Sequence, residues 1–366
     1  MNQPKHLKRF NLVPIVPLLL ALLFCFSATP AGLAGADAIR QPSRSDGQTP
    51  APTGKIKVFI LMGQSNMVGM GDLQPADKPG TLKHLIQTDK KYPFLADAAG
   101  NWTVCQNVYY YDARLHQGSY LSATANNGRT FGPELGFGWV IGQQLAAPVL
   151  LLKSCIGNRS LGWDLLPPGS ERYVVAGTTY AGYRDSPASW IAGQPRKTND
   201  WYAGKQYDVD LANAQAALKN IASIYPNYHG QGYEIAGFVW WQGHKDHFSP
   251  VYADRYEFNL ANLIQQLRQD YHAPQAKFVL ATIGFGGWKM TGLAKTIAEA
   301  QLAVGDAKKH PEFAGNVACL EARGFWPEAK DSPNPRQDYH YYHNAETYLE
   351  VGLGLGRAMA DLLNHP

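Results

Sequence analysis

Short apolar runs alternate with longer amphipathic stretches along the chain from Lys55 onward. Five runs rich in valine, isoleucine and leucine predict buried strands: Lys57–Met62, Pro148–Lys153, Ile235–Trp241, Lys277–Ile283 and Asn316–Leu320. Five stretches with helical spacing lie between or after them: Pro133–Leu145, Val209–Ile224, Tyr252–Tyr271, Leu293–Lys308 and Ala345–Leu363. Apolar strands separated by amphipathic helices indicate a parallel sheet that is covered on both faces. The pattern therefore predicts an α/β protein.

Two long insertions, residues 72–129 and 157–206, interrupt this alternation and have little periodicity. Loops of this length inside a compact domain are usually functional. The second insertion is rich in aromatic residues: Trp163, Tyr173, Tyr180, Tyr183, Trp190, Trp201 and Tyr202. Such side chains can pack a loop onto the domain, and they can also stack on sugar rings. We expect a subset of them to line a carbohydrate cleft.

The N-terminal segment differs from the rest of the chain. Basic residues precede an apolar run from Leu12 to Phe26, and small residues follow as far as Ala36. This order is typical of a secretory signal peptide, with an uncleaved membrane anchor as the alternative. Residues 37–54 are rich in Ser, Pro, Gly, Thr and Gln and predict a disordered linker. We expect a signal peptide over residues 1–36 and an exported domain over residues 55–366, periplasmic or secreted and free of the membrane after cleavage.

Composition narrows the possible partners. The chain has 366 residues, 45% of them hydrophobic, and a net charge of +4. These values suit a protein with a large core and argue against nucleic acid as the partner. Cys25 would leave with the signal peptide, so Cys105, Cys155 and Cys319 could form one bridge and a free thiol, or three buried thiols. No cysteine or histidine spacing is typical of a metal site, so we expect neither a metal nor another cofactor.

The segment Lys57–Met67 is the most informative, because an apolar strand ends there in Gly63-Gln64-Ser65. The carboxyl ends of parallel strands open onto the crevice where ligands bind. The Ser65 hydroxyl is therefore placed to meet a substrate. The same residue could instead cap a helix.

A serine nucleophile needs a base, a group that orients the base, and hydrogen-bond donors for the oxyanion. Gly157 follows the second apolar run and could bring its N–H close to a substrate, or could be a loop glycine with positive φ. Gln242 follows the third run and could donate from its amide. His340 stands just before the last helix, and Asp338 could orient its ring. These positions are candidates for the remaining groups of a hydrolase site.

Four blocks in this order resemble the SGNH hydrolase superfamily: Gly63–Met67, Ile156–Leu161, Trp241–Asp246 and a terminal His340. Within it the chain is similar to the sialate O-acetylesterase and acetylxylan esterase branch, carbohydrate esterase family 6, from about Lys55 to Leu363. The resemblance implies a flavodoxin-like three-layer α/β/α sandwich with a central parallel sheet of about five strands. It also implies metal-independent removal of acetyl groups from sugar hydroxyls.

The resemblance also implies roles for individual residues. Ser65 would be the nucleophile and His340 the general base, while the Ser65 N–H, Gly157 and Gln242 would form the oxyanion hole. Other polar residues of the same blocks are expected to contact the substrate: Gln64, Asn66, Arg159, His244 and Asp246.

Three positions depart from the family pattern. Asn158 replaces the second glycine of a glycine pair, and His244 stands where the family often has a glutamate. The family's aspartate three residues before the histidine is Gln337 here, and Asp338 is two residues before it. The group that orients His340 is therefore open between Asp338, Asp246 and a backbone carbonyl.

The sequence thus predicts an exported serine carbohydrate O-acetylesterase that acts on an acetylated glycan through an acetyl-enzyme intermediate. The alternative is a carbohydrate-binding protein with a degenerate esterase site. A lipase-type α/β-hydrolase fits less well, because its nucleophile elbow has glycines on both sides of the serine, whereas Gly63 and Met67 flank Ser65 here. The sequence separates neither the acetylated sugars nor the oligomeric states.

Overall fold

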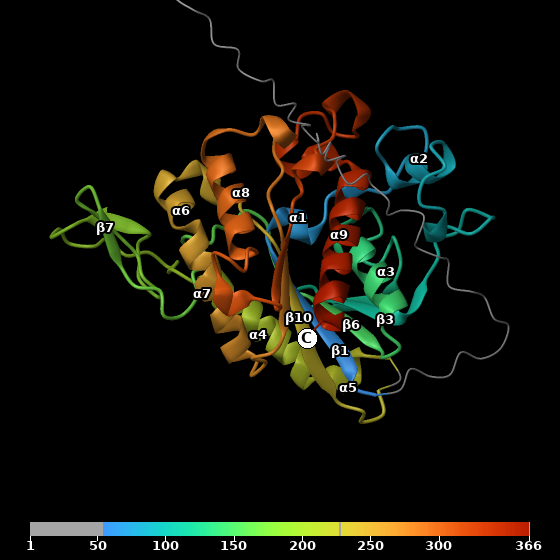
Figure 1. Ribbon diagram of the computed structural model, residues 1–366, viewed down its shortest axis with the longest axis horizontal. Helices are drawn as coiled ribbons and strands as arrows, with labels where there is room; N and C mark the ends of the chain where they lie inside the picture. The colour runs from blue at the N-terminus through green and yellow to red at the C-terminus, as the bar shows by residue number, and fades with distance from the viewer. Residues whose placement is uncertain (1–53, 227, 366) are drawn as a thin grey trace, which may run out of the picture. The chain divides into compact units, whose positions relative to one another are not determined.

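A seven-stranded sheet forms the centre of the protein in the computed structural model, which describes residues 54–226 and 228–365. The expected signal peptide and the linker up to Thr53 lie outside the described residues. The strands follow in the order β12 (Val317–Leu320), β11 (Lys277–Ala281), β10 (Tyr233–Trp241), β1 (Ile56–Gly63), β6 (Val149–Lys153), β3 (Cys105–Asp112) and β4 (Gln117–Leu121) (Figure 1). Neighbouring strands are parallel except β3 and β4, which are antiparallel.

Strand β1 lies in the middle of the sheet and is buried on both faces. Ile56, Val58, Ile60 and Met62 point into one core, and Phe59 and Leu61 point into the other. Alternate residues of a strand point to opposite faces, so a continuous apolar run places a hydrophobic side chain in each core.

Helices cover both faces of the sheet (Figure 1). On one face, α3 (Glu134–Gln144) and α9 (Ala345–Asn364) supply Phe137 and Leu349 to the core that contains Phe59. On the other, α4 (Lys205–Lys219), α7 (Tyr256–Asp270) and α8 (Gly292–Val304) cover the core that contains Ile60. The predicted three-layer α/β/α class is confirmed.

The connections of the sheet define its ligand-binding edge. After β1 the chain forms β3, β4 and β6, all on one side of β1, and then passes to β10 on the other side. The direction of winding therefore reverses at β1, and the carboxyl end of the strand at such a reversal opens onto a crevice. The short helix α1 (Ser65–Val68) begins at that point.

The five predicted strands and the five predicted helical segments are all present, with differences in three helices. The helix expected over Leu293–Lys308 ends at Val304. The helix expected over Val209–Ile224 begins at Lys205 and is interrupted at Asn220, where α5 (Ile221–Ile224) follows. The helix expected over Tyr252–Tyr271 is divided at Arg255 into α6 (Pro250–Asp254) and α7. Periodicity continues across both breaks because the segments on either side face the same core.

The expected number of about five strands was too low, because the insertion 72–129 contains β3 and β4. The β3 sequence is CQNVYYYD and that of β4 is QGSYL, and neither is a continuous apolar run. Strand β4 lies at the edge of the sheet and has a neighbouring strand on one side only, so it is less enclosed than a central strand. The same insertion and its flank hold a two-stranded ribbon, β2 (Gly71–Asp72) with β5 (Thr130–Phe131).

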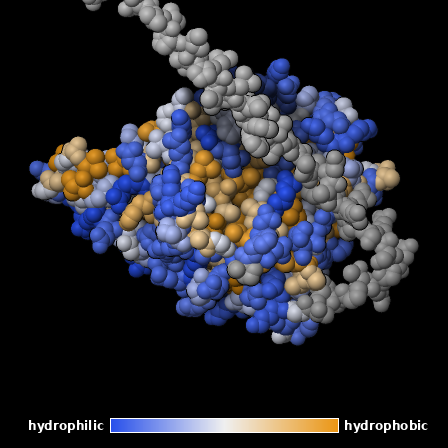
Figure 2. Space-filling view, viewed as in Figure 1, coloured by the Kyte–Doolittle hydropathy of each residue, from blue (hydrophilic) through white to orange (hydrophobic). Residues whose placement is uncertain are grey.

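The insertion 157–206 forms a three-stranded antiparallel sheet, β7 (Tyr173–Val175), β8 (Thr178–Tyr180) and β9 (Ser189–Ile191). This sheet projects from the α/β body (Figure 1). Its apolar side chains Val174, Val175 and Ile191 are exposed. Figure 2 shows a hydrophobic region, in orange, on the projecting part at the left. Other residues of the insertion return to the body beside the loop after β6.

Further features of the described residues concern disulfide bonds, metal-binding clusters and membrane-spanning helices. Cys105, Cys155 and Cys319 are free thiols there, and burial raises the pKa of Cys105 to about 12. Residues 54–226 and 228–365 contain no group of three or more His, Cys, Asp or Glu side chains that could hold a metal ion. Among the helices of the same residues, none has both the length and the apolar composition needed to cross a bilayer.

Candidate active site

Ser65 is held by a tight turn at the end of β1. Gly63 has a φ of 151°, and a Cβ atom there would lie 2.3 Å from the Trp241 carbonyl oxygen. Only glycine fits where the backbones of the neighbouring strands β1 and β10 come so close together. Ser65 follows as the first residue of α1 with 8% of its surface exposed. The nucleophile candidate is therefore fixed by backbone packing.

Gly157 lies directly beside Ser65. A Cβ atom on Gly157 would be 3.3 Å from the Ser65 Cβ. The φ of Gly157 is not positive, so a close approach and not a left-handed conformation accounts for this glycine. In the described part of the chain, neither the Ser65 N–H nor the Gly157 N–H donates to another residue. Both remain available to an oxyanion.

Asn158 accounts for the departure from the family's glycine pair. Its φ is 58°, in the left-handed region. Asparagine adopts this conformation more readily than other residues that carry a Cβ. The substitution is thus compatible with a turn that a glycine would also form.

The Gln242 amide, expected to donate to the oxyanion, is committed to protein acceptors. Its Nε2 donates to Asp246 Oδ2 at 2.5 Å and to the Arg159 carbonyl at 2.8 Å, and the side chain is 1% exposed. Its Oε1 accepts a hydrogen bond from the Tyr256 hydroxyl at 2.7 Å. Gln242 therefore joins the loop after β10 to the loop after β6, and the expectation of a free third donor is not met.

Asp246 is buried and has a structural environment. Its carboxylate accepts hydrogen bonds from the backbone N–H groups of Leu161 and Gly162 at 2.9 and 2.8 Å. Burial raises its pKa to about 6. The sequence suggested that Asp246 contacts the substrate or orients His340. The structure supports neither role, because the Asp246 side chain is fully buried and hydrogen-bonded to other groups.

Gln64 uses only half of its amide. Its Oε1 accepts from the backbone N–H groups of Gly243 and Lys245 at 3.4 and 3.2 Å and from Gln242 Nε2 at 3.2 Å. Its Nε2 is buried without a hydrogen-bond partner among the described residues. Gln64 thus anchors the β10 loop from the position directly before Ser65.

The segment Asp338–His343, a short 3-10 turn before α9, carries His340. Tyr341, Tyr342 and His343 have φ values of 49°, 54° and 62°, all in the left-handed region. Each such residue costs free energy and persists only where its surroundings hold it. Tyr341 supplies the anchor, because its fully buried ring stacks on Trp241 at 5.2 Å and its hydroxyl accepts from the Gly284 N–H at 2.8 Å.

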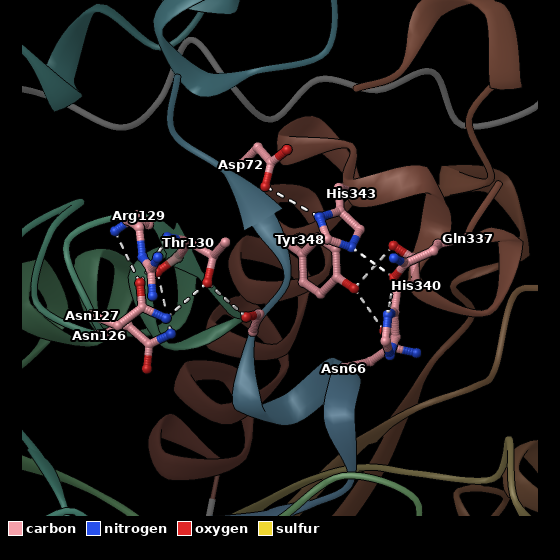
Figure 3. A network of polar contacts seen from close by, with 11 residues as sticks. Asn66, Asp72, Asn126, Asn127, Arg129, Thr130, Gln337, His340, His343 and Tyr348 are labelled. Carbon is pink, nitrogen blue, oxygen red and sulfur yellow. Dashed lines mark hydrogen bonds and ion pairs between the residues drawn. The ribbon is translucent and has the colours of Figure 1, made fainter. Parts of the chain in front are cut away.

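Asn66 connects this turn to α1. Its Nδ2 donates to the Tyr339 carbonyl at 3.2 Å. Because Asn66 follows Ser65 and Tyr339 precedes His340, the contact brings the segments of nucleophile and base together. Figure 3 shows Asn66 close to His340. No hydrogen bond joins Ser65 Oγ to His340 among the residues described. Such catalytic hydrogen bonds are often long until substrate is bound.

The ring of His340 is oriented by Gln337, not by Asp338. His340 Nδ1 lies 2.8 Å from Gln337 Oε1. Asp338 is exposed, and its Oδ1 accepts from the Tyr339 N–H at 2.8 Å. The His340 N–H donates to the Gln337 carbonyl at 3.0 Å, and this i to i+3 turn places the two side chains on the same side. This corrects the expectation that Asp338 orients His340.

Gln337 continues into a chain of polar contacts (Figure 3). Its Oε1 also lies 2.9 Å from His343 Nε2, and His343 Nδ1 lies 3.1 Å from Asp72 Oδ1. Gln337, His343 and Asp72 were not identified from the sequence. Asp72 lies in the insertion 72–129, where no periodicity pointed to it. Gln337 stands where the family has an aspartate, and this was the one sequence feature that pointed to the group.

His340 and His244 are both partly enclosed. Burial, with the nearby His343 ring, lowers the pKa of His340 to about 4. Burial likewise lowers the pKa of His244 to about 4, together with the neighbouring His247 and other positive groups. At neutral pH both rings are therefore neutral, and His340 can accept a proton.

His244 belongs to an aromatic cluster at the side of the His340 turn. Its ring centroid lies 5.1 Å from that of Phe285 and 5.7 Å from that of Tyr339. It does not replace the family's glutamate, because a neutral imidazole packed on aromatic rings carries no negative charge for His340.

Arg159 lines a cleft beside the loop that borders Ser65. Its guanidinium lies 4.8 Å from the Trp201 ring centroid, and its Nε donates to Gln206 Oε1 at 3.1 Å. The cleft has a volume of about 510 Å³ and is also lined by Trp163 and Asn199. Two of the aromatic residues of the insertion, Trp163 and Trp201, therefore do face a cleft.

Parts of this sequence are similar to known proteins. Residues 188–361 match the family described as carbohydrate esterase, sialic acid-specific acetylesterase. A probable carbohydrate esterase of Arabidopsis thaliana is 28% identical over 127 residues, which are 35% of this chain and 41% of that relative. The match thus spans less than half of the relative's length.

One solved structure shares the fold of this chain. The X-ray structure of the same Arabidopsis thaliana protein has a TM-score of 0.51 at 18% identity and covers 85% of this chain and 100% of that chain. A carbohydrate acetylesterase from Xanthomonas citri has a TM-score of 0.44 at 16% identity, covering 82% of this chain and 55% of the other. The family match over residues 188–361 contains two of the four sequence blocks, Trp241–Asp246 and His340, and agrees with the resemblance found in the sequence.

Proposed function

We propose that this protein is an exported serine esterase that removes acetyl groups from sugar hydroxyls through an acetyl-enzyme intermediate. One observation carries the proposal: the Gly157 backbone lies beside Ser65, and Asn66 holds the turn of His340 against the same helix. A hydroxyl, unengaged N–H groups and a neutral imidazole are thus gathered at the carboxyl edge of the sheet. The match to a carbohydrate esterase family supports the esterase role.

In this mechanism His340 Nε2 takes the proton of Ser65 as Oγ attacks the acetyl carbonyl carbon. The N–H groups of Ser65 and Gly157 donate to the carbonyl oxygen while negative charge builds on it. The bond to the sugar oxygen then breaks, and His340 returns the proton to that oxygen. Water repeats the sequence on the acetyl-enzyme and releases acetate.

The cleft beside Arg159 suits the sugar part of the substrate. Trp201 and Trp163 supply aromatic faces, and Arg159 and Asn199 supply hydrogen-bond donors. Arg159 is two residues from Gly157, so a glycan in the cleft would extend from the acetyl group that Ser65 attacks. Most ligand sites combine apolar walls with a few polar groups in this way.

The decisive experiment measures acetate release from a panel of acetylated glycans by the wild-type protein and by Ser65→Ala. We expect Ser65→Ala to lose at least 1000-fold in rate, as loss of a triad nucleophile does, on the order of 10³ or more. Ser223→Ala removes a hydroxyl from an exposed serine and serves as the matched control. Hydrolysis that is unchanged by Ser65→Ala would disprove the assignment.

A carbohydrate-binding protein with little turnover is the second candidate. The observation that favours it is the neutral Gln337 amide at His340 Nδ1, where a hydrolase triad has a carboxylate. The same panel separates the two. Glycan binding that Trp201→Ala weakens, without Ser65-dependent acetate release, would support the second candidate.

Export is the part of the proposal that rests on the sequence of residues 1–36. We expect the mature protein to begin near Asp37. Mass spectrometry of the protein recovered from the periplasm or the medium would identify its first residue. An intact N-terminus in the cell extract would contradict signal cleavage.

A further inference from the structure

Four side chains form a continuous polar chain that ends at the candidate base. The contacts are Asp72 Oδ1 to His343 Nδ1 at 3.1 Å, His343 Nε2 to Gln337 Oε1 at 2.9 Å, and Gln337 Oε1 to His340 Nδ1 at 2.8 Å (Figure 3). Asp72 comes from β2, and the other three come from the turn before α9. A carboxylate from the first insertion is thus joined to His340 through two side chains.

The donor and acceptor types in this chain restrict the state of His343. A carboxylate accepts hydrogen bonds and does not donate, and the same holds for an amide oxygen. His343 lies between Asp72 Oδ1 and Gln337 Oε1, so both of its ring nitrogens face acceptors. Both nitrogens of an imidazole are donors only when the ring is protonated. The arrangement therefore fits an imidazolium paired with the Asp72 carboxylate.

The inward orientation of the Gln337 oxygen is the one that a protonated His343 stabilises. An imidazolium attracts the amide oxygen and repels the amide NH₂ group. With the oxygen inward, His340 must donate from Nδ1, which leaves Nε2 free to accept the Ser65 proton. With NH₂ inward, the His340 proton would lie on Nε2, and the ring could not act as a base.

We propose that Asp72 is a positioning residue for His340: it holds His343 as a cation, and His343 holds the Gln337 oxygen against His340 Nδ1. The kinetic part of this inference rests on the proposed esterase function. Asp72 then supplies the orienting charge that the family's terminal aspartate would supply directly. The three left-handed residues of the turn are consistent with this role, because that conformation brings both histidine rings to one amide oxygen.

The arrangement also has a chemical consequence. The titratable groups that face His343 are Asp72 and the His340 ring, whose centroid is 5.8 Å away. A cation at this distance opposes formation of a second imidazolium at His340, whereas a carboxylate would favour it. The relay therefore fixes the tautomer of the base but stabilises its protonated form less than a direct carboxylate does.

The first test replaces Asp72 by asparagine, which has nearly the same shape without the charge. We expect Asp72→Asn to lower kcat for acetate release about tenfold or more and to leave KM within about twofold. Because unfolded protein would also lower the apparent kcat without changing KM, kcat is expressed per folded enzyme, with the folded fraction measured by near-UV circular dichroism. Asp77→Asn, an exposed aspartate of the same segment, is the matched control. An unchanged kcat in Asp72→Asn would overturn the proposal.

The second test supplies a carboxylate directly. Gln337→Glu is close to isosteric and places a carboxylate oxygen at His340 Nδ1, so His340 no longer depends on Asp72. We expect Asp72→Asn to cost less than about threefold in kcat in the Gln337→Glu background. Equal losses in both backgrounds would mean that Asp72 acts independently of Gln337 and would overturn the relay.

The third test reads the ring of His343 without turnover. Nitrogen NMR of Ser65→Ala labelled at histidine should show both ring nitrogens of His343 protonated at pH 7, and one of them deprotonated in Ser65→Ala/Asp72→Asn. A neutral His343 at pH 7 in Ser65→Ala would overturn the proposal. Because this readout needs no activity, it stands even if Ser65→Ala shows that the protein is not a serine esterase.

Discussion

Asn66 and Tyr348 form a 2.6 Å hydrogen bond in which the tyrosine hydroxyl donates to the asparagine Oδ1. The same hydroxyl lies 3.1 Å from the His340 carbonyl, and both side chains are buried. Tyr348 lies on α9 and Asn66 on α1. The hydroxyl therefore fixes the relative positions of the helix that begins with Ser65 and the turn that carries His340.

Removal of this hydroxyl should loosen the site. In Tyr348→Phe, Asn66 Oδ1 loses its partner in a buried environment, which costs about 1–3 kcal/mol. We expect the free energy of unfolding, measured in urea, to fall by that amount and kcat to fall with it. Tyr233→Phe changes an exposed tyrosine and should alter neither quantity. A Tyr348→Phe variant with wild-type stability and kcat would refute the coupling.

A buried ion pair between Lys153 and Glu134 contacts the end of α1. Lys153 Nζ lies 2.7 Å from Glu134 Oε2 and donates to the Val68 carbonyl at the end of α1, at 3.0 Å. Both side chains of the pair are nearly fully buried. Lys153→Met leaves the Glu134 carboxylate without its charge partner, so we expect a loss of about 3–5 kcal/mol in unfolding free energy.

The double variant Lys153→Met/Glu134→Gln tests the cause of this loss. A neutral amide in place of the Glu134 carboxylate can still accept from the Gly132 N–H, which now donates to Glu134 Oε1 at 2.8 Å. We expect the double variant to recover at least half of the lost stability. If it is no more stable than Lys153→Met, the loss comes from packing and not from the uncompensated charge.

The pH dependence of the reaction should reflect the environment of His340. Burial and the His343 ring lower the pKa of His340 to about 4. A general base acts only when it is unprotonated, so a lowered pKa keeps the base active in more acidic solution. We expect kcat/KM to rise through about pH 4 and to stay level up to neutral pH.

Gln337→Glu provides the comparison for this profile. A carboxylate beside His340 favours the protonated ring and raises its pKa. The acidic limb of kcat/KM should therefore move to higher pH in this variant. A wild-type limb near the ordinary histidine pKa of about 6.5 would contradict the lowered pKa of His340. A limb that moves to lower pH in Gln337→Glu would contradict the assignment of His340 as the base.

The cleft beside Arg159 predicts a difference between large and small substrates. Trp201→Ala removes an aromatic ring that lines the cleft and packs against the Arg159 guanidinium. Loss of one such stacking partner is worth about 1–2 kcal/mol, so we expect KM for an acetylated oligosaccharide to rise about tenfold. The effect on p-nitrophenyl acetate should be much smaller, and Trp201→Phe should retain most of the affinity. An equal loss on both substrates would place the role of Trp201 elsewhere.

The central layers of this protein could be predicted because local sequence encodes them. The apolar run of β1 feeds both cores by simple alternation, and Gly63 ends it where only glycine fits. Ser65, Gly157 and His340 were predicted because each follows a strand or precedes a helix that periodicity identifies. The edge strands β3 and β4 were missed because polar and tyrosine-rich segments at the side of a sheet lack that signal.

The partners of the site residues were decided by tertiary structure alone. Asp338 and Gln337 are adjacent in sequence, yet the turn closed by the His340 N–H and the Gln337 carbonyl brings His340 to Gln337. Gln242 has the right side chain for an oxyanion donor, but buried acceptors from two other loops occupy its amide. Asp72 joins the site through its contact with His343, which is 271 positions away in the chain. The sequence by itself determined which chemical groups stand at the ends of the strands, because strands and helices follow from local periodicity. Which of those groups hydrogen-bond to one another depended on how distant loops pack, and no local pattern records that.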